Sequence, residues 1–270
     1  TTSIAQANGI FAKYGLQIVP YGGSATIAQN GDILGSYVDD DVARREIARH
    51  SKRDSDAVVR YHRDIMRQCR FIRKFLLRTA PDPTSFRMRD LREMLYLGKE
   101  ASRLGEDGLY DMMRFYTMSI KDFLDEYFES PLIKAAYAGS GIIGSALGVM
   151  SPGTAYVLLH HAMGEVDGNP GAWGFARGGM GAIAKAMNAC FEEFGGQTIC
   201  GSGVKQILVR NGRVTGVALE NGDEHYSDVV VSNMTFPRTF LECMDAKDLE
   251  PSFLKKVRNF KIRGSSGKLN

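Results

Sequence analysis

Cysteine is scarce in this sequence of 270 residues, and the four cysteines form no C-x-x-C pair. They stand far apart, at Cys69, Cys190, Cys200 and Cys243. Disulfide-rich domains and thiolate metal sites need denser and more regular cysteine spacing, so neither is expected. The sequence therefore predicts a protein of a reducing compartment that holds no metal.

The sequence also lacks a large excess of charge. It has 34 Lys and Arg against 31 Asp and Glu, a net charge of +3. Domains that bind nucleic acid usually concentrate basic residues on one face, so no nucleic-acid partner is expected. The first residues, TTSIAQANGIF, lack the basic region and apolar core of a signal peptide. We expect a cytoplasmic protein, or one of the mitochondrial matrix if the source is eukaryotic.

The two ends of the sequence lack the features of complete termini. The chain does not begin with Met, and its last residues, KIRGSSGKLN, follow no closing element of structure. We interpret it as an internal piece of a longer protein.

A third absence is local, because residues 135–164 contain no Asp, Glu, Lys or Arg. Such a length is enough to span a bilayer. Helix-breaking residues and the pair His160-His161 argue against a transmembrane helix. The breakers are Gly139, Gly141, Gly144, Gly148, Pro152 and Gly153. We predict two buried helices around a turn at 151–153, which line an apolar cavity.

The first half has the spacing of a mostly helical domain with a small sheet. Residues 14–38 predict strands, with a hairpin turn at Asn30-Gly31. Apolar residues spaced three and four apart predict a helix over 41–78 and further helices over 90–104 and 112–128.

The helical segment 44–78 is strongly basic, with twelve Lys and Arg against four Asp and Glu. Two interpretations remain open. The basic residues form a solvated helix face, or they contact an anionic surface such as membrane headgroups.

The last third alternates between helix and strand. Residues 181–194 predict a helix with Ile183, Met187, Cys190 and Phe194 facing inward. Strands are expected over 197–200, 203–210, 213–220 and 228–232, with turns at Asn211-Gly212 and Asn221-Gly222. The predicted fold class is α+β or α/β: a largely helical domain plus part of a Rossmann-like domain with a β-hairpin or meander.

Residues 139–144, GSGIIG, match the G-x-G-x-x-G dinucleotide fingerprint. That fingerprint holds a diphosphate only when a strand leads into it and a helix follows. Here the preceding residues predict a helix. We interpret these glycines as small residues that allow close helix packing.

Three strings carry a family resemblance: PGTAYVLLHHAMG from Pro152, GAWGFARGGMGAIAKAM from Gly171, and the hairpin region that ends at Asn233. Together they resemble the phytoene dehydrogenase-like FAD-dependent oxidoreductases. The resemblance implies a substrate domain over 1–170, a second portion of the FAD-binding domain over 171–235, and a return to the substrate domain over 236–270. The family's N-terminal strand-GxGxxG-helix is not in this sequence, so we expect the piece alone to be inactive and not to retain FAD.

The resemblance also implies site residues. The residue at Val204 would contact adenine through its backbone, although its position equally suits an ordinary inward strand residue. Ser232 and Asn233 would neighbour the adenosine and diphosphate, or serve only as turn formers. Trp173 and Phe175 would line the substrate cavity, or belong to the core.

His160 and His161 are neighbours, so on a helix their side chains point about 100° apart and cannot chelate one metal together. One of them is a candidate for substrate contact, with a satisfied buried histidine as the alternative. No catalytic residue is identified, and no feature indicates an oligomeric state.

The implied function is FAD-dependent dehydrogenation or desaturation of a hydrophobic small molecule. The flavin would carry the chemistry, so the absence of an evident catalytic side chain is expected. The alternatives are a non-catalytic module that binds a lipophilic ligand or a protein, and a flavin-assisted isomerase.

Overall fold

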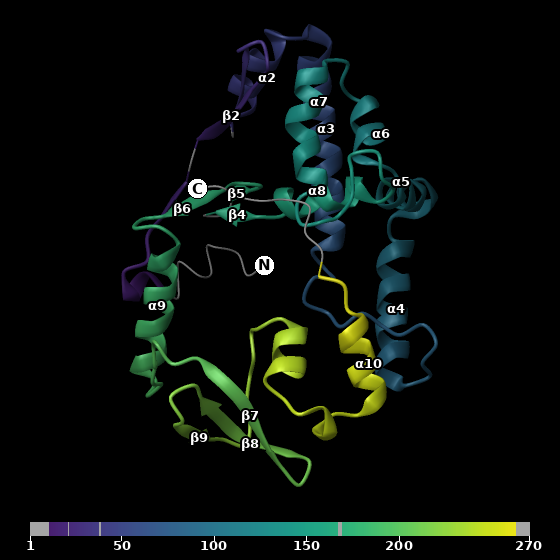
Figure 1. Ribbon diagram of the computed structural model, residues 1–270. Helices are drawn as coiled ribbons and strands as arrows, with labels where there is room; N and C mark the ends of the chain where they lie inside the picture. The colour runs from purple at the N-terminus through teal and green to yellow at the C-terminus, as the bar shows by residue number, and fades with distance from the viewer. Residues whose placement is uncertain (1–10, 21, 38, 167–168, 263–270) are drawn as a thin grey trace. The chain divides into compact units, whose positions relative to one another are not determined.

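The computed structural model describes residues 11–20, 22–37, 39–166 and 169–262, which divide into two compact units near residue 190 (Figure 1). The helices of the first unit are α2 (Asp40–Ala48), α3 (Lys52–Ile72), α4 (Met88–Ser102), α5 (Gly105–Thr117), α6 (Ile120–Asp125), α7 (Pro131–Ala138), α8 (Thr154–Ala162) and α9 (Met180–Glu193), with 3-10 turns η1 (Ala12–Tyr14) and η2 (Gly139–Gly141). Its strands are β1 (Ile18–Pro20), β2 (Gly23–Ile27), β3 (Ile33–Tyr37), β4 (Glu165–Val166), β5 (Asn169–Pro170) and β6 (Gly174–Ala176). The second unit contains β7 (Val204–Arg210), β8 (Arg213–Leu219), β9 (Glu224–Tyr226), η3 (Arg238–Glu242), η4 (Ala246–Asp248) and α10 (Pro251–Asn259). The predicted mixed fold of helices and small sheets is confirmed.

Two predicted helices are each divided by a serine cap. The helix expected over 41–78 is α2 followed by α3, and Ser51 between them is extended while its hydroxyl accepts from the Asp54 N–H. In the same way, Ser119 caps α6 and separates it from α5 within the expected helix 112–128. A serine that satisfies the free N–H groups of a new helix start stabilises a break that apolar spacing alone does not reveal.

The core of the first unit forms where α3, α5, α6, α7 and α8 meet. Tyr61 of α3 is buried at its centre, and its ring lies 4.9 Å from that of Tyr137 and 5.2 Å from that of Phe128. Asp54 is fully buried, and its carboxylate accepts from the N–H groups of Glu129 and Ser130 at 2.8 and 2.9 Å. These bonds hold the start of α7 against α3.

The uncharged stretch is helical only in part. α8 follows the predicted turn at 151–153, where Gly153 has a φ of 81°, but the first predicted helix is wrong in extent, because α7 ends at Ala138 and residues 139–153 form η2 and irregular turns. Within the described residues, no helix is long and apolar enough to cross a membrane.

The GSGIIG segment continues from α7 into η2, so no strand leads into it. Gly141 is buried, and a Cβ atom at that position would lie 2.7 Å from the Ile120 Cβ. This glycine allows two helical segments to approach closely, in agreement with the packing interpretation.

The strands of the first unit form separate two-stranded ladders. β2 and β3 make the predicted antiparallel hairpin, with Gly31 at a φ of 83°. β1 does not join them, because it pairs with β6, where Val19 stands opposite Phe175.

The second unit has the three-stranded antiparallel meander β7-β8-β9. Asn211 and Gly212 both have positive φ angles, 52° and 71°, as the predicted tight turn requires. The strands expected over 197–200 and 228–232 are wrong, since neither segment is in a ladder in the described structure and Val231 is 90% exposed. Both have strand-like composition but find no partner strand among the described residues, and backbone pairing is what makes a strand.

Helix α9 was predicted in the right place, and its predicted inward face is only partly right: Ile183 packs against the cluster of Leu16, Ala176 and Ala186, but Met187 and Phe194 do not face inward. Met187 is 53% exposed and Phe194, just beyond the helix, is 82% exposed. The helix packs instead through Ala186, which clusters with Leu16. The residues that cover α9 come from the short segment around η1, and they contact Ala186 and leave Met187 exposed.

Candidate functional site

The main cavity of the first unit lies between the β2–β3 hairpin, helices α2, α3, α7 and α8, and the segment 171–173. We call it the hairpin cavity, and its volume is about 720 Å³. It is lined by Gly23, Ser24, Thr26, Leu34, Gly35, Ser36, Tyr37, Asp40, Ala43, Ile47, Tyr61, His62, Ile65, Met66, Ala136, Tyr137, Ser140, Leu158, His161, Ala162, Gly171 and Trp173. A volume of this size is in the range of small-molecule sites.

Aromatic and aliphatic side chains dominate the lining. Its aromatic residues are Tyr37, Tyr61, Tyr137 and Trp173, and no Lys or Arg lies among the described lining residues. Asp40 is the one carboxylate, and its Oδ1 lies 3.4 Å from Nδ1 of His62. Burial is the main cause that lowers the pKa of His62. These walls suit a neutral, apolar ligand.

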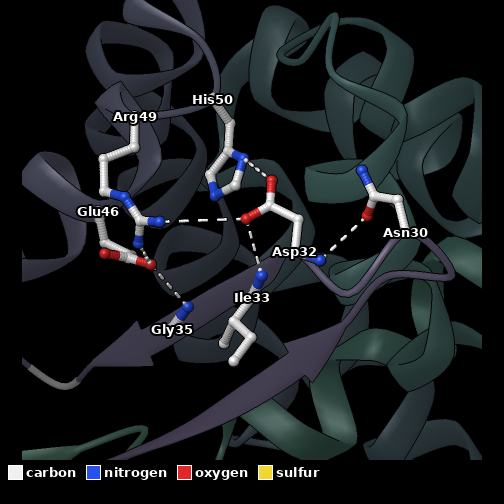
Figure 2. Close-up of polar contacts among 7 residues, drawn as sticks. All are labelled: Asn30, Asp32, Ile33, Gly35, Glu46, Arg49 and His50. Atoms are coloured by element: carbon white, nitrogen blue, oxygen red, sulfur yellow. Dashed lines mark hydrogen bonds and ion pairs between the residues drawn. The ribbon is translucent and has the colours of Figure 1, made fainter.

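One polar cluster holds the turn end of the hairpin against the end of α2 (Figure 2). The Asp32 carboxylate accepts from the Ile33 N–H at 2.8 Å and lies 3.4 Å from Nδ1 of the buried His50. The Asp32 N–H in turn donates to the Asn30 side-chain oxygen at 3.0 Å. The turn is thus closed locally and tied to the end of α2.

A second polar contact joins β3 of the hairpin to α2, at Gly35. Glu46 Oε1 accepts from the Gly35 N–H at 3.1 Å and from Arg49 Nη1 at 2.6 Å, as Figure 2 shows. The backbone hydrogen bond, followed by that from Arg49, lowers the pKa of Glu46. Since Gly35 and its neighbour Leu34 line the cavity, Glu46 positions one cavity wall.

Two of the four predicted cavity residues lie at the hairpin cavity. The indole Nε1 of Trp173 donates to the backbone oxygen of His161 at 3.1 Å, and the two rings are stacked. Trp173 is 46% exposed, so it forms part of the rim. His161 Nδ1 is buried without a hydrogen-bond partner among the described residues, and burial lowers its pKa.

The other two predicted residues lie outside the lining. His160 is exposed, and its ring meets that of Tyr156 edge-on at 5.3 Å. Phe175 is 66% exposed on β6. A direct contact of either with a ligand stays a prediction.

Sequence reasoning missed Tyr61, Tyr137 and His62 as cavity residues. Tyr61 belongs to the apolar stripe of α3, and that stripe signals burial without saying whether a side chain meets another helix or a cavity. The available signal in the sequence for a cavity at this position was the adjacent pair of ring-bearing residues Tyr61 and His62.

The residues predicted near the flavin lie in the second unit. Val204 begins β7, and its backbone oxygen is approached by the Cys243 thiol at 3.9 Å. The Ser232 hydroxyl lies 2.8 Å from that of Thr239 and accepts from the Met234 N–H at 3.3 Å, while Asn233 is exposed.

These contacts test how well the described residues fit FAD. Ser232 is already engaged in a local turn, and the described residues include no strand that leads into a glycine-rich turn and a helix. A diphosphate needs such a turn. The residues present fit at most one edge of the nucleotide and do not complete its site.

At least seven of the twelve Lys and Arg of segment 44–78 are in ion pairs. The ion pairs join Arg44 to Asp56, Arg49 to Glu46, Arg53 to Glu129, Arg63 to Asp64, Arg67 to Asp111, Lys74 to Glu100 and Arg78 to Glu93. Paired guanidinium groups support the solvated-face interpretation, and the membrane contact stays a prediction. In the part of the chain that the structure describes, no group of three or more His, Cys, Asp or Glu could hold a metal.

Sequence comparison confirms the resemblance to phytoene dehydrogenase-like oxidoreductases. Pyridine nucleotide-disulfide oxidoreductase domain-containing protein 2 of Mus musculus is 32% identical over 235 residues, which are 84% of this chain and 40% of that protein. Hydroxyneurosporene desaturase of Rubrivivax gelatinosus is 37% identical over 138 residues, 51% of this chain and 25% of that protein.

A third relative is named as an isomerase. Prolycopene isomerase 2 of an Oncidium hybrid cultivar is 26% identical over 179 residues, 66% of this chain and 29% of that protein. The chain thus spans less than half the length of these curated relatives. No protein-family model matches it.

Proposed function

Because this chain is a relative of pyridine nucleotide-disulfide oxidoreductase domain-containing protein 2 and of carotenoid desaturases, we propose that it is part of an FAD-dependent oxidoreductase. In this proposal the first unit binds a hydrophobic small molecule that is dehydrogenated or desaturated. The division into a substrate domain over 1–170, a flavin portion over 171–235 and a substrate portion over 236–270 belongs to the same proposal.

The hairpin cavity is the observation that carries the proposal. Its walls combine Tyr61, Tyr137 and Trp173 with aliphatic side chains and have no Lys or Arg among the described lining residues. Burying apolar ligand surface against such walls is favourable by about 25 cal/mol per Å². The chain's own residues would bind the substrate, orient it and exclude water.

When bound, a flavin would supply acceptance of a hydride from a C–H bond. In the present chain only Val204, Ser232 and Asn233 are proposed to lie near its adenosine end. Residues that hold the diphosphate would have to come from other parts of the protein, since the described residues do not complete that site.

The test uses the full-length protein. It should be yellow after purification because of bound flavin. Anaerobic mixing with a polyene or a similar apolar candidate should bleach the absorbance of the oxidised flavin at about 450 nm. Tyr137→Ala should slow bleaching, while Phe86→Ala, which changes an exposed aromatic side chain outside the cavity lining, should not. A colourless full-length protein would contradict the proposal.

Two alternatives predict other results. The likeness to a protein named prolycopene isomerase favours a flavin-assisted isomerase as the second candidate. That enzyme would convert a geometric isomer with no net change in the flavin absorbance. A non-catalytic binding module would be colourless and would still extract lipophilic molecules from vesicles.

A further inference from the structure

We propose that the hairpin cavity binds a lipophilic molecule that ends in a hydrogen-bond donor, a hydroxyl or an amino group, and that Asp40 and His62 hold this end at the mouth of the cavity. The inference rests on the proposed function, because it names the ligand class of the same cavity. It goes further by giving the ligand an orientation, with its apolar body inward.

The lining of the cavity divides into a buried apolar part and an accessible polar part. Leu34, Ile47 and Leu158 are at most 5% exposed and belong to the core of the first unit. Asp40 and His62 line the same cavity, but their side chains are 78% and 39% exposed. We call this accessible pair the mouth. A ligand therefore meets apolar walls where it is buried and polar atoms where the cavity opens to solvent.

The two polar side chains of the mouth lie together and are open to a ligand. His62 Nδ1 on α3 lies 3.4 Å from Asp40 Oδ1 on α2. Among the described residues, the polar side-chain atoms that are buried without a partner belong to His50, Tyr116 and His161. The polar atoms of the mouth are not in that group, so a ligand reaches them without a change in the protein.

The charge of Asp40 acts on the aromatic wall of the cavity. Burial, followed by the Asp40 carboxylate, raises the pKa of Tyr137 to about 12. Tyr137 lines the cavity, so the carboxylate lies close enough to this wall to disfavour a second negative charge there. A ligand that packs along Tyr137 is therefore within the field of the carboxylate.

The two groups of the mouth favour a ligand that donates. An ionised carboxylate only accepts hydrogen bonds, so Asp40 pairs with a hydroxyl or an amino group but not with an ether oxygen. Burial is the main cause that lowers the pKa of His62, so its imidazole is uncharged near neutral pH. A ligand carboxylate would face Asp40 with no Lys or Arg among the described lining residues to pair with it. Free acids are therefore the least favoured ligands.

The experiment compares four probes of one shape on the chain: retinol, retinylamine, retinyl methyl ether and retinoic acid. Trp173 is the single tryptophan of the sequence and lines the cavity, so quenching of its emission reports a bound probe. We expect retinol and retinylamine to bind about 3- to 10-fold more tightly than the ether, and retinoic acid to bind most weakly. The ratio of retinol to retinylamine tells whether the mouth prefers a neutral or a charged donor.

Matched variants locate the effect. Asp40→Ala removes the acceptor, so retinol and retinylamine should fall to the affinity of the ether, while retinoic acid should bind more tightly than before. Asp41→Ala removes the same charge from the same first turn of α2 but lies outside the lining, and should keep the order of the four probes. His62→Phe keeps an aromatic ring beside Tyr61 but removes both nitrogens, and should reduce the preference for retinol over the ether.

Three outcomes would overturn the inference. Equal binding of retinol, retinylamine and the ether to the unmodified chain would do so even if the variants fail to fold. A preference for the two donors that survives in Asp40→Ala, or is lost equally in Asp41→Ala, would also do so while leaving the proposed function intact. Binding of none of the probes would overturn the proposed function as well.

Discussion

The indole of Trp173 lies against the imidazole of His161, twelve positions earlier in the chain, whereas the adjacent His160 is not part of the cavity lining. The stacked pair joins α8 to the segment before β6 and forms one rim of the hairpin cavity. It is the contact through which substitutions at the rim should reach the ligand.

Truncation of the rim should weaken binding of an apolar dye. Trp173→Ala removes aromatic surface from the cavity and should reduce the affinity for Nile red about 5- to 20-fold. Phe86→Ala removes a more exposed aromatic ring that is not part of the cavity lining, and should leave the affinity unchanged. Dye fluorescence titration measures both, and equal losses in the two variants would place the dye elsewhere.

Gly141 should resist enlargement. Gly141→Ala places a methyl group 2.7 Å from the buried Ile120 Cβ, and should lower the free energy of unfolding by about 1–3 kcal/mol. Gly139→Ala is the control in the same GSGIIG string, because a Cβ there meets nothing within 4 Å. Urea denaturation measures the difference, and two equally mild variants would argue against the packing role.

The buried carboxylate of Asp54 should be intolerant of a conservative change. Asp54→Asn leaves one side-chain oxygen to accept from two N–H groups, those of Glu129 and Ser130, and should cost about 2 kcal/mol of unfolding free energy. Asp56→Asn, on the same helix with its side chain 80% exposed, should cost little. Thermal or urea melts measure the unfolding midpoints of both variants, and equal shifts of the two midpoints would contradict this account of the α3–α7 contact.

The hairpin attachment should be sensitive to acid. The folded-state pKa of Glu46 is lowered, first by the Gly35 N–H and then by Arg49, so its stabilisation is present above the unfolded value of 4.5 and is lost as the pH falls through the lower folded pKa. Stability should therefore decline below about pH 5 with a contribution from this group. Glu46→Gln should show a shallower decline than the unmodified chain in urea melts between pH 7 and pH 3.

The control for this prediction is Glu106→Gln, which removes the same charge from the exposed first turn of α5. That change affects only the helix dipole, by a few tenths of a kcal/mol at about neutral pH. If both variants follow the unmodified chain down to pH 3, Glu46 does not hold the hairpin.

Local chemistry was readable where neighbouring residues decide the structure. The turns at Asn30-Gly31 and Asn211-Gly212 were predicted because asparagine and glycine accept positive φ angles, which Gly31 adopts in the first turn and both residues adopt in the second. The start of α8 followed from the proline and glycine at 152–153. The family resemblance was likewise carried by contiguous strings of residues.

Structure that depends on distant partners was not readable in the same way. Residues 228–232 have the composition of a strand, yet pairing decides the matter and no ladder forms there among the described residues. The buried face of α9 depended on which segment covers it, and Leu16 proved to lie against Ala186 rather than Met187.

The sequence by itself determined the turns, the approximate helices, the absence of charge in 135–164 and the family to which the chain is similar, because each is written in adjacent residues. The tertiary structure alone decided that Tyr61, Tyr137 and Trp173 share one cavity, and that His161 rather than His160 lines it. Those facts depend on how α3 packs against α7 and α8, which are distant from it in the sequence. Packing also fixes which face of α8 is turned toward the cavity.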